Sequence, residues 1–394
     1  MMPKRKRIYL DYAASTPTCA KALKEAERIL ENNWGNPGSL HEEGRLAISE
    51  LDKARQNFSE KLGVNFRDVI FISSATEANN LVISGAAAAY RTKHRQGGRI
   101  IISSVEHDSV RIPSRALLKS GFEVIEVRPA KNGIVDPHKV LESVSEETFL
   151  VSIICANNEV GSIQPIKKIA LGLKEKNSKT LLHTDASQAL QFMDCSSQSL
   201  GADLITLSSQ KIYGPRGAGA LILPEKIRSL IHPQILGGHQ EWGVRSGTEN
   251  VSAIVGFSAA LSCVYKNREK EAARINKLKL ALWEGIKKNH RWALINGPLP
   301  KNTLPHILNI RFPKVPADAL LSALDMQGIS ASAGSACAMR SPEASPTLLS
   351  MGLSETAAKE SIRFSIGRPT SSKDIKNTLF ALQKSLNDLT GLSG

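Results

Sequence analysis

The sequence predicts an α/β protein with a mostly parallel β-sheet between helices and a second, smaller α+β domain. From about residue 20 to 260, short apolar runs alternate with segments of helical period, the pattern of a parallel sheet that is covered on both faces. No GxGxxG segment follows the first run, so a dinucleotide-binding fold is not supported. After about residue 260 a long charged helical pattern begins. We therefore expect a large domain at 20–260 and a small domain at 1–19 and 261–394.

The large domain is predicted to hold a seven-stranded sheet. Its candidate strands are DVIFIS (68–73), RIIISS (99–104), FEVIEV (122–127), FLVSII (149–154), TLLHTD (180–185), DLITLS (203–208) and AGALIL (218–223). Segments of helical period, such as 77–93 and 164–177, lie between most of them.

The small domain is predicted from a different mixture of elements. The charged helix at 263–288 leads into HILNIRF (306–312), the helical segment 316–328, AGSACAMRSP (333–342) and SIRFSIG (361–367). A terminal helix at 371–389 opens with a serine cap and an acidic residue in its first turn.

Composition narrows the class of protein. The 394 residues carry a net charge of +14, but Lys and Arg are spread along the whole chain and aromatic residues make up only 5%. We interpret the charge as solvated helix faces and do not expect direct nucleic-acid binding; affinity for tRNA in a salt titration is the test of that alternative. Five cysteines without a CxxC pair argue against a disulfide framework or a zinc site. No apolar run nears the roughly 20 residues of a membrane helix, and no signal peptide is recognisable, so we expect a cytoplasmic protein.

Two residues at strand ends suggest chemistry. Lys211 follows a candidate strand directly, where α/β sheets bind ligands, and a desolvated lysine there can form a Schiff base. Asp185 ends the preceding candidate strand and can keep a pyridine nitrogen protonated, as pyridoxal phosphate (PLP) requires. A surface lysine in a turn and a helix-capping aspartate are the plain alternatives.

Two further features support the same chemistry. A helix begins near Thr76 in SSATEANNL, and the N–H groups at such an end can bind a phosphate. His107 follows another candidate strand and can stack on a cofactor ring. Each feature alone also fits a capped helix or a hydrogen-bonded loop histidine, whereas the combination is specific.

The chain resembles the cysteine desulfurases, PLP-dependent enzymes of fold type I in the class V aminotransferase family. The matching motifs cover nearly the whole chain: YLDYAASTP, GNPGSLH, SSATEANNL, EHDSV, ANNEVGSIQPI, HTDASQ, LSSQKIYGPRGAGAL, GGHQEWGVRSGTEN, SAGSAC and SIRFSIGR. Cys337 and Arg363 are 26 residues apart (363 − 337 = 26), which resembles the branch with a long cysteine loop.

The resemblance implies how PLP would be held. Lys211 would bind it as a Schiff base and later move protons, while His107 would stack on its ring. Asp185 would pair with the pyridinium, and Gln188 would hydrogen-bond the phenolic oxygen.

The resemblance also implies the phosphate and substrate contacts. The phosphate ligands would be Ala75, Thr76 and Ser208, with Thr248 supplied by the neighbouring subunit of a homodimer. Asn158 would lie near the cofactor and the substrate carboxylate, which Arg363 would bind through its planar fork. Gln210 stands where the family commonly has a histidine that helps to bind the phosphate, so we expect weaker phosphate anchoring.

Cys337 lies among small residues, which suits a thiolate on a flexible tether. The resemblance implies that Cys337 takes the sulfur of L-cysteine as a persulfide, releases L-alanine and passes the sulfur to an acceptor protein. That acceptor would serve iron–sulfur cluster assembly or tRNA thiolation. No metal site is expected, apart from transient binding of a cluster iron by Cys337.

Other activities stay open at this point. A selenocysteine lyase could use the same residues, and another class V aminotransferase would need no thiol at position 337. A non-catalytic sulfur-relay scaffold is the alternative outside enzymes, and the intact set of Lys211, Asp185, His107, Cys337 and Arg363 argues against it.

Overall fold

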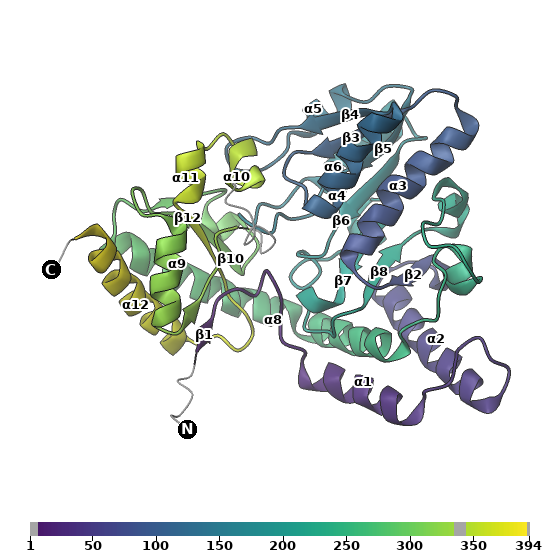
Figure 1. Ribbon diagram of the computed structural model, residues 1–394, viewed down its shortest axis with the longest axis horizontal. Coiled ribbons are helices and arrows are strands. Elements are labelled where there is room, and N and C mark those ends of the chain that lie inside the picture. Colours follow the sequence, from purple (N-terminus) through teal and green to yellow (C-terminus); the bar gives the residue numbers. More distant parts are fainter. Residues whose placement is uncertain (1–6, 335–343, 392–394) are drawn as a thin grey trace.

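The computed structural model describes residues 7–334 and 344–391. It shows a large sheet with helices on both faces and, beside it, a smaller group of strands and helices (Figure 1). Cys337 lies outside the described residues.

The predicted seven-stranded, mostly parallel sheet is confirmed. Its strand order is β2-β8-β7-β6-β5-β3-β4, and β8 is antiparallel to both β7 and β2 while the other pairs are parallel. The strands are β2 (Val69–Ile72), β3 (Arg99–Ser103), β4 (Glu123–Val127), β5 (Thr148–Ser152), β6 (Leu181–Asp185), β7 (Leu204–Ser208) and β8 (Gly219–Ile222). Each falls within two residues of its predicted bounds.

Both faces of this sheet are buried. In β2, Val69 and Phe71 point into one hydrophobic core, whereas Ile70 and Ile72 point into the other. This alternation follows from the two-residue period of a strand and explains why the sequence shows continuous apolar runs.

Helices cover the two faces of the seven-stranded sheet and form much of the smaller group of elements beside it. They are α1 (Ala20–Asn32), α2 (Glu42–Leu62), α3 (Ala75–Lys93), α4 (Asp108–Ala116), α5 (Pro137–Glu142), α6 (Ile166–Lys176), α7 (Ser197–Leu200), α8 (Val251–Asn289), α9 (Ala317–Met326), α10 (Pro346–Ser350), α11 (Glu355–Lys359) and α12 (Ser372–Thr390). The expected serine cap of α12 is present, since Ser371 and Asp374 form a capping box. Among helices of the described residues, none combines the length and hydropathy that crossing a bilayer requires.

Two small sheets form beside the large one. One is antiparallel, with the order β12-β10-β9, and the other is a parallel pair, β1-β11. Their strands are β1 (Ile8–Tyr9), β9 (Leu294–Ile295), β10 (Ile307–Arg311), β11 (Ile329–Ser330) and β12 (Ser361–Ser365). The N-terminal strand thus joins the C-terminal part of the chain, and α8 runs from the large sheet to these small ones (Figure 1). We propose 20–260 as one domain and 1–19 with 261–394 as the other.

A buried ion pair closes the edge of the large sheet at β2. Arg55 donates two hydrogen bonds of 2.9 and 2.8 Å to the Glu241 carboxylate and another to the Val69 carbonyl. Glu241 in turn accepts from Phe71 N–H at 2.9 Å. The pair therefore satisfies edge-strand groups that would otherwise stay open, and it fixes the turn that precedes α8. Glu241 and Trp242 adopt left-handed backbone conformations, with φ of 47° and 55°, which the ion pair holds in place.

Breaking this pair should destabilise the protein strongly. We expect Glu241→Gln to lower the free energy of unfolding by about 3 to 5 kcal/mol, because the buried Arg55 charge loses its partner. Urea denaturation measures the change. The control is Glu225→Gln, which removes the exposed ion pair with Arg67 and should cost less than about 1 kcal/mol. Equal losses in the two variants would contradict the role of the buried pair.

Candidate active site

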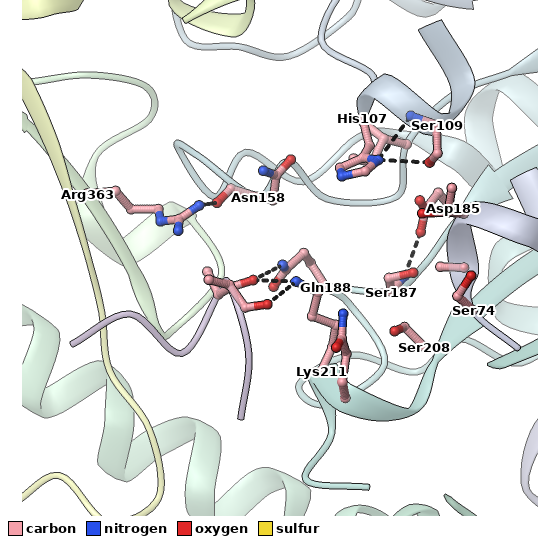
Figure 2. A pocket seen from close by; sticks show the side chains of 16 residues that line it. Ser74, His107, Ser109, Asn158, Asp185, Ser187, Gln188, Ser208, Lys211 and Arg363 are labelled. Carbon is pink, nitrogen blue, oxygen red and sulfur yellow. Dashed lines mark hydrogen bonds between the residues drawn. The ribbon is translucent and has the colours of Figure 1, made fainter. Parts of the chain in front are cut away.

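A cavity of about 220 Å³ opens at the carboxyl ends of the parallel strands (Figure 2). Most of the predicted site residues line it, although they come from distant parts of the sequence. Those that line it are Ala75, Thr76, His107, Asn158, Asp185, Gln188, Ser208, Gln210, Lys211 and Arg363. Thr248 does not line this cavity.

Lys211 projects into the cavity from the turn that follows β7. Its Nζ donates hydrogen bonds of 2.7 Å to the carbonyls of Ala13 and Ala14. These carbonyls belong to the segment between β1 and α1, so the N-terminal part of the chain positions the lysine. The predicted location of Lys211 beyond a strand end is confirmed.

Asp185 and His107 belong to one hydrogen-bond network. Asn79 on α3 donates to Asp185 Oδ2 and to Ser109 Oγ, both at 2.8 Å, and Ser187 N–H donates to Asp185 Oδ1 at 2.9 Å. Ser109 Oγ lies 2.8 Å from His107 Nδ1, which also accepts from Ser109 N–H. Two donors thus hold the Asp185 carboxylate, and the proton of a neutral His107 ring sits on Nε2.

Asn79 and Ser109 were not assigned from the sequence. Their sequence positions give a weak indication that they belong to the site. Asn79 lies one helical turn beyond Ala75, on the face of α3 that starts at the expected phosphate site, and Ser109 follows His107 by two positions.

The beginning of α3 lines the cavity, and the N–H groups at such a helix end can bind an anion. Ser74 caps the helix by accepting from Glu77 N–H, and Ala75 and Thr76 follow at its first two positions. Gly219 of β8 packs against this turn, because a Cβ there would lie only 2.9 Å from the Ser74 carbonyl carbon. The absence of a side chain at Gly219 therefore allows the helix end to sit directly on the sheet.

Arg363 is buried and already engaged. Its Nη2 donates to Asp11 Oδ1 at 2.6 Å, and its Nη1 donates to the Asn158 carbonyl at 2.9 Å. Arg363 Nε has no hydrogen-bond partner among residues 7–334 and 344–391. A carboxylate that binds here must therefore share the guanidinium with Asp11, a residue that sequence reasoning did not single out.

A buried acid connects the two ends of the cysteine-bearing segment. Ser345 Oγ donates to Glu159 Oε2 at 2.5 Å, and a Cβ on Gly334 would lie 2.9 Å from the same oxygen. Burial raises the pKa of Glu159, while hydrogen bonds from Ser345 and Thr347 and the charge of Arg363 act in the opposite direction. Gly334 and Ser345, on either side of 335–343, thus contact one side chain next to Asn158.

A second buried acid, Glu106, lies directly before His107. Its Oε1 accepts from Ser103 Oγ and, at 2.7 Å, from Ile154 N–H. Burial raises its pKa to about 8, and the charge of Asp185 adds to the increase. At neutral pH the protonated form of Glu106 is therefore favoured.

The cavity fits PLP. A lysine that can bind it covalently, a carboxylate for its ring nitrogen and a helix end for its phosphate lie around one space (Figure 2). Ser187 Oγ, a lining hydroxyl, is buried without a hydrogen-bond partner in the described part of the chain, as expected where a polar ligand belongs. Within that same part, no group of His, Cys, Asp and Glu side chains could hold a metal ion.

Comparison with known proteins places this architecture. The model of the family "Aminotransferase class-V" matches residues 8–378. Cysteine desulfurase IscS of Dictyoglomus turgidum is 36% identical over 389 residues, which covers 99% of this chain and 97% of that protein. A solved NifS-like protein has a TM-score of 0.90 at 32% identity and covers 98% of this chain and 100% of its own. A structure titled "SspA in complex with cysteine" has a TM-score of 0.79 at 30% identity and covers 92% and 99%.

The raised pKa of Glu106 should make stability depend on pH. Between its ordinary pKa of 4.5 and about 8, the folded state holds a proton that the unfolded state has released, so this group makes stability fall as pH rises. Glu106→Gln keeps the shape but cannot titrate. Melting temperatures from pH 5 to 8.5 should therefore shift in favour of the variant with increasing pH. A difference between variant and wild type that is independent of pH would show that Glu106 does not titrate in this range.

Proposed function

The chain belongs to the class V aminotransferase family, whose cofactor is PLP, and we propose that it is a cysteine desulfurase. It converts L-cysteine to L-alanine and takes up the sulfur on Cys337. The observation that carries this proposal is the single cavity that Asp185 at the end of β6, Lys211 in the turn after β7 and Arg363 within β12 line together. Relatives named cysteine desulfurase that match nearly the full length support the substrate.

Three residues of the cavity have distinct proposed roles toward the cofactor and the substrate Cα. Bound at Lys211, PLP supplies a ring that withdraws electrons from the substrate Cα. Asp185, held by the Asn79 side chain and Ser187 N–H, would keep the ring nitrogen protonated. His107 would pack against the cofactor ring, and Lys211 would move a proton at Cα.

The remaining predicted residues hold the substrate and phosphate. We assign the substrate carboxylate to Arg363 and Asn158, and the phosphate to Ala75, Thr76 and Ser208. We assign to Gln188 a hydrogen bond to the phenolic oxygen of PLP. Gln210 lines the cavity, and we keep the proposal that it anchors the phosphate less strongly than a histidine.

The sulfur step uses the Cys337 thiolate as nucleophile. The thiolate attacks the substrate sulfur, a sulfur–sulfur bond forms, and the carbon–sulfur bond breaks. The electron pair of the broken bond stays with the substrate carbon, which gains a proton and leaves as L-alanine. The persulfide on Cys337 then passes its outer sulfur to a thiol of an acceptor protein, of the scaffold or tRNA-thiolation type.

We further propose a cytoplasmic homodimer. Leu30, Trp34 and Leu40, at and beyond the end of α1, are 67%, 74% and 91% exposed, and exposed apolar surface of this kind favours a protein interface. Thr248 is exposed and does not line the cavity of its own chain, which agrees with a contact to the neighbouring subunit. Free thiols at Cys19, Cys155, Cys195 and Cys263 support a reducing compartment.

Cysteine turnover tests the proposed activity. Wild type with L-cysteine and a reductant should release sulfide and alanine in equal amounts, and Cys337→Ala should lose both while its yellow cofactor absorbance persists. Cys263→Ala, which changes a partly buried cysteine, is the control and should behave like wild type. Alanine release that survives Cys337→Ala would point to another PLP lyase or transferase. Turnover on selenocysteine relative to cysteine separates the lyase alternative.

The oligomeric state tests the proposed interface. Trp34→Glu should raise the dissociation constant of the dimer by about 30-fold or more, because losing a buried aromatic anchor costs about 2 kcal/mol or more. Light scattering during size-exclusion chromatography measures the mass. Phe380→Glu, at a 72% exposed position of α12, is the control and should stay dimeric. A monomeric wild type would refute the dimer, and a Trp34→Glu variant that dimerises normally would move the interface elsewhere.

A further inference from the structure

A buried histidine behind the cavity has no part in the mechanism above. His306, directly before β10, is 3% exposed. Its ring stacks on Phe192 with 4.6 Å between centroids, and its Nε2 lies 3.2 Å from Gln188 Oε1. Burial lowers the pKa of His306 well below its usual range, and the positive charges of Lys279, Arg363 and Lys211 lower it further. The ring is therefore neutral at pH 7.

His306 and the Ala13 carbonyl together determine how the Gln188 amide is turned. This carbonyl can only accept hydrogen bonds, and it lies 2.8 Å from the Gln188 side-chain nitrogen. The amide NH₂ group must therefore face Ala13, and the amide oxygen must face His306. A neutral imidazole satisfies that oxygen only in the tautomer with its proton on Nε2. Opposite rotation of the amide would place its oxygen against the Ala13 carbonyl.

We propose that His306 is a positioning residue that locks the Gln188 amide with its NH₂ group toward the cofactor. The inference rests on the proposed assignment of Gln188 to the phenolic oxygen of PLP. That oxygen carries negative charge and needs a donor, so an amide turned the wrong way would present an oxygen to it and weaken binding. His306 acts on the cofactor through Gln188 and does not itself line the cavity.

Cofactor affinity tests this role without measuring turnover. His306→Phe keeps a flat ring to stack on Phe192 but removes the donor. We expect the dissociation constant of PLP, from an absorbance titration of the refolded or cofactor-stripped full-length protein, to rise about two- to tenfold, the range of one neutral hydrogen bond. His306→Gln can place a donor near the former Nε2 and should recover most of the affinity. The control is His290→Phe, which changes a buried histidine that does not line the cavity and should leave the affinity unchanged.

A double-mutant cycle separates positioning from general structural damage. In a Gln188→Ala background, His306→Phe should cause no further loss, because the amide it orients is gone. Equal losses in the two backgrounds, or a His306→Phe variant that binds PLP like wild type, would overturn the inference and leave the proposed function intact. A Gln variant as weak as the Phe variant would also overturn it. A wild type that binds no PLP would instead refute the proposed function, and this inference with it.

Discussion

The site depends on one constraint, the common direction of the strands in the large sheet. Because β5, β6 and β7 are parallel neighbours, their carboxyl ends meet at one edge, and the turns that follow them converge on one space. Asp185 and Lys211 come together for this reason, although 26 residues separate them (211 − 185 = 26). The antiparallel strand β8 does not disrupt this edge. It begins at the edge with Gly219, whose lack of a side chain lets the start of α3 pack against the sheet.

Much of this architecture can be predicted because its causes are local. Strands buried on both faces need continuous apolar runs, and all seven are visible in the sequence. Residues at strand ends, such as Asp185, His107 and Lys211, can be placed by counting from those runs. The cap of α3 and the capping box at Ser371 depend on side chains within a few positions. The family resemblance supplied roles that spacing alone does not provide.

The remaining contacts join positions that no local period relates. Asp11 meets Arg363 across 352 residues, and Gln188 meets His306 across 118. The residue type of a buried polar side chain does not reveal whether it is hydrogen-bonded, lacks a partner or has a function. Its partner can be identified only in the folded structure, where distant parts of the sequence meet. The buried Glu106 illustrates the electrostatic side of this limit. Its raised pKa follows from burial and from the nearby charge of Asp185, which outweigh the hydrogen bonds from Ser103 and Ile154, and none of these is visible in its own sequence context.

Three residues near the N-terminus, Asp11, Ala13 and Ala14, contact residues on different sides of the site. Asp11 contacts Arg363, and the carbonyls of Ala13 and Ala14 hold Lys211, while Ala13 also accepts from Gln188. Under the proposed assignment of the substrate carboxylate to Arg363, a carboxylate that competes with Asp11 for the guanidinium would act on the same short stretch of backbone that holds the lysine. Any effect of carboxylate binding on the lysine would be matched by an equal effect of the lysine on carboxylate binding, because a coupling free energy works in both directions.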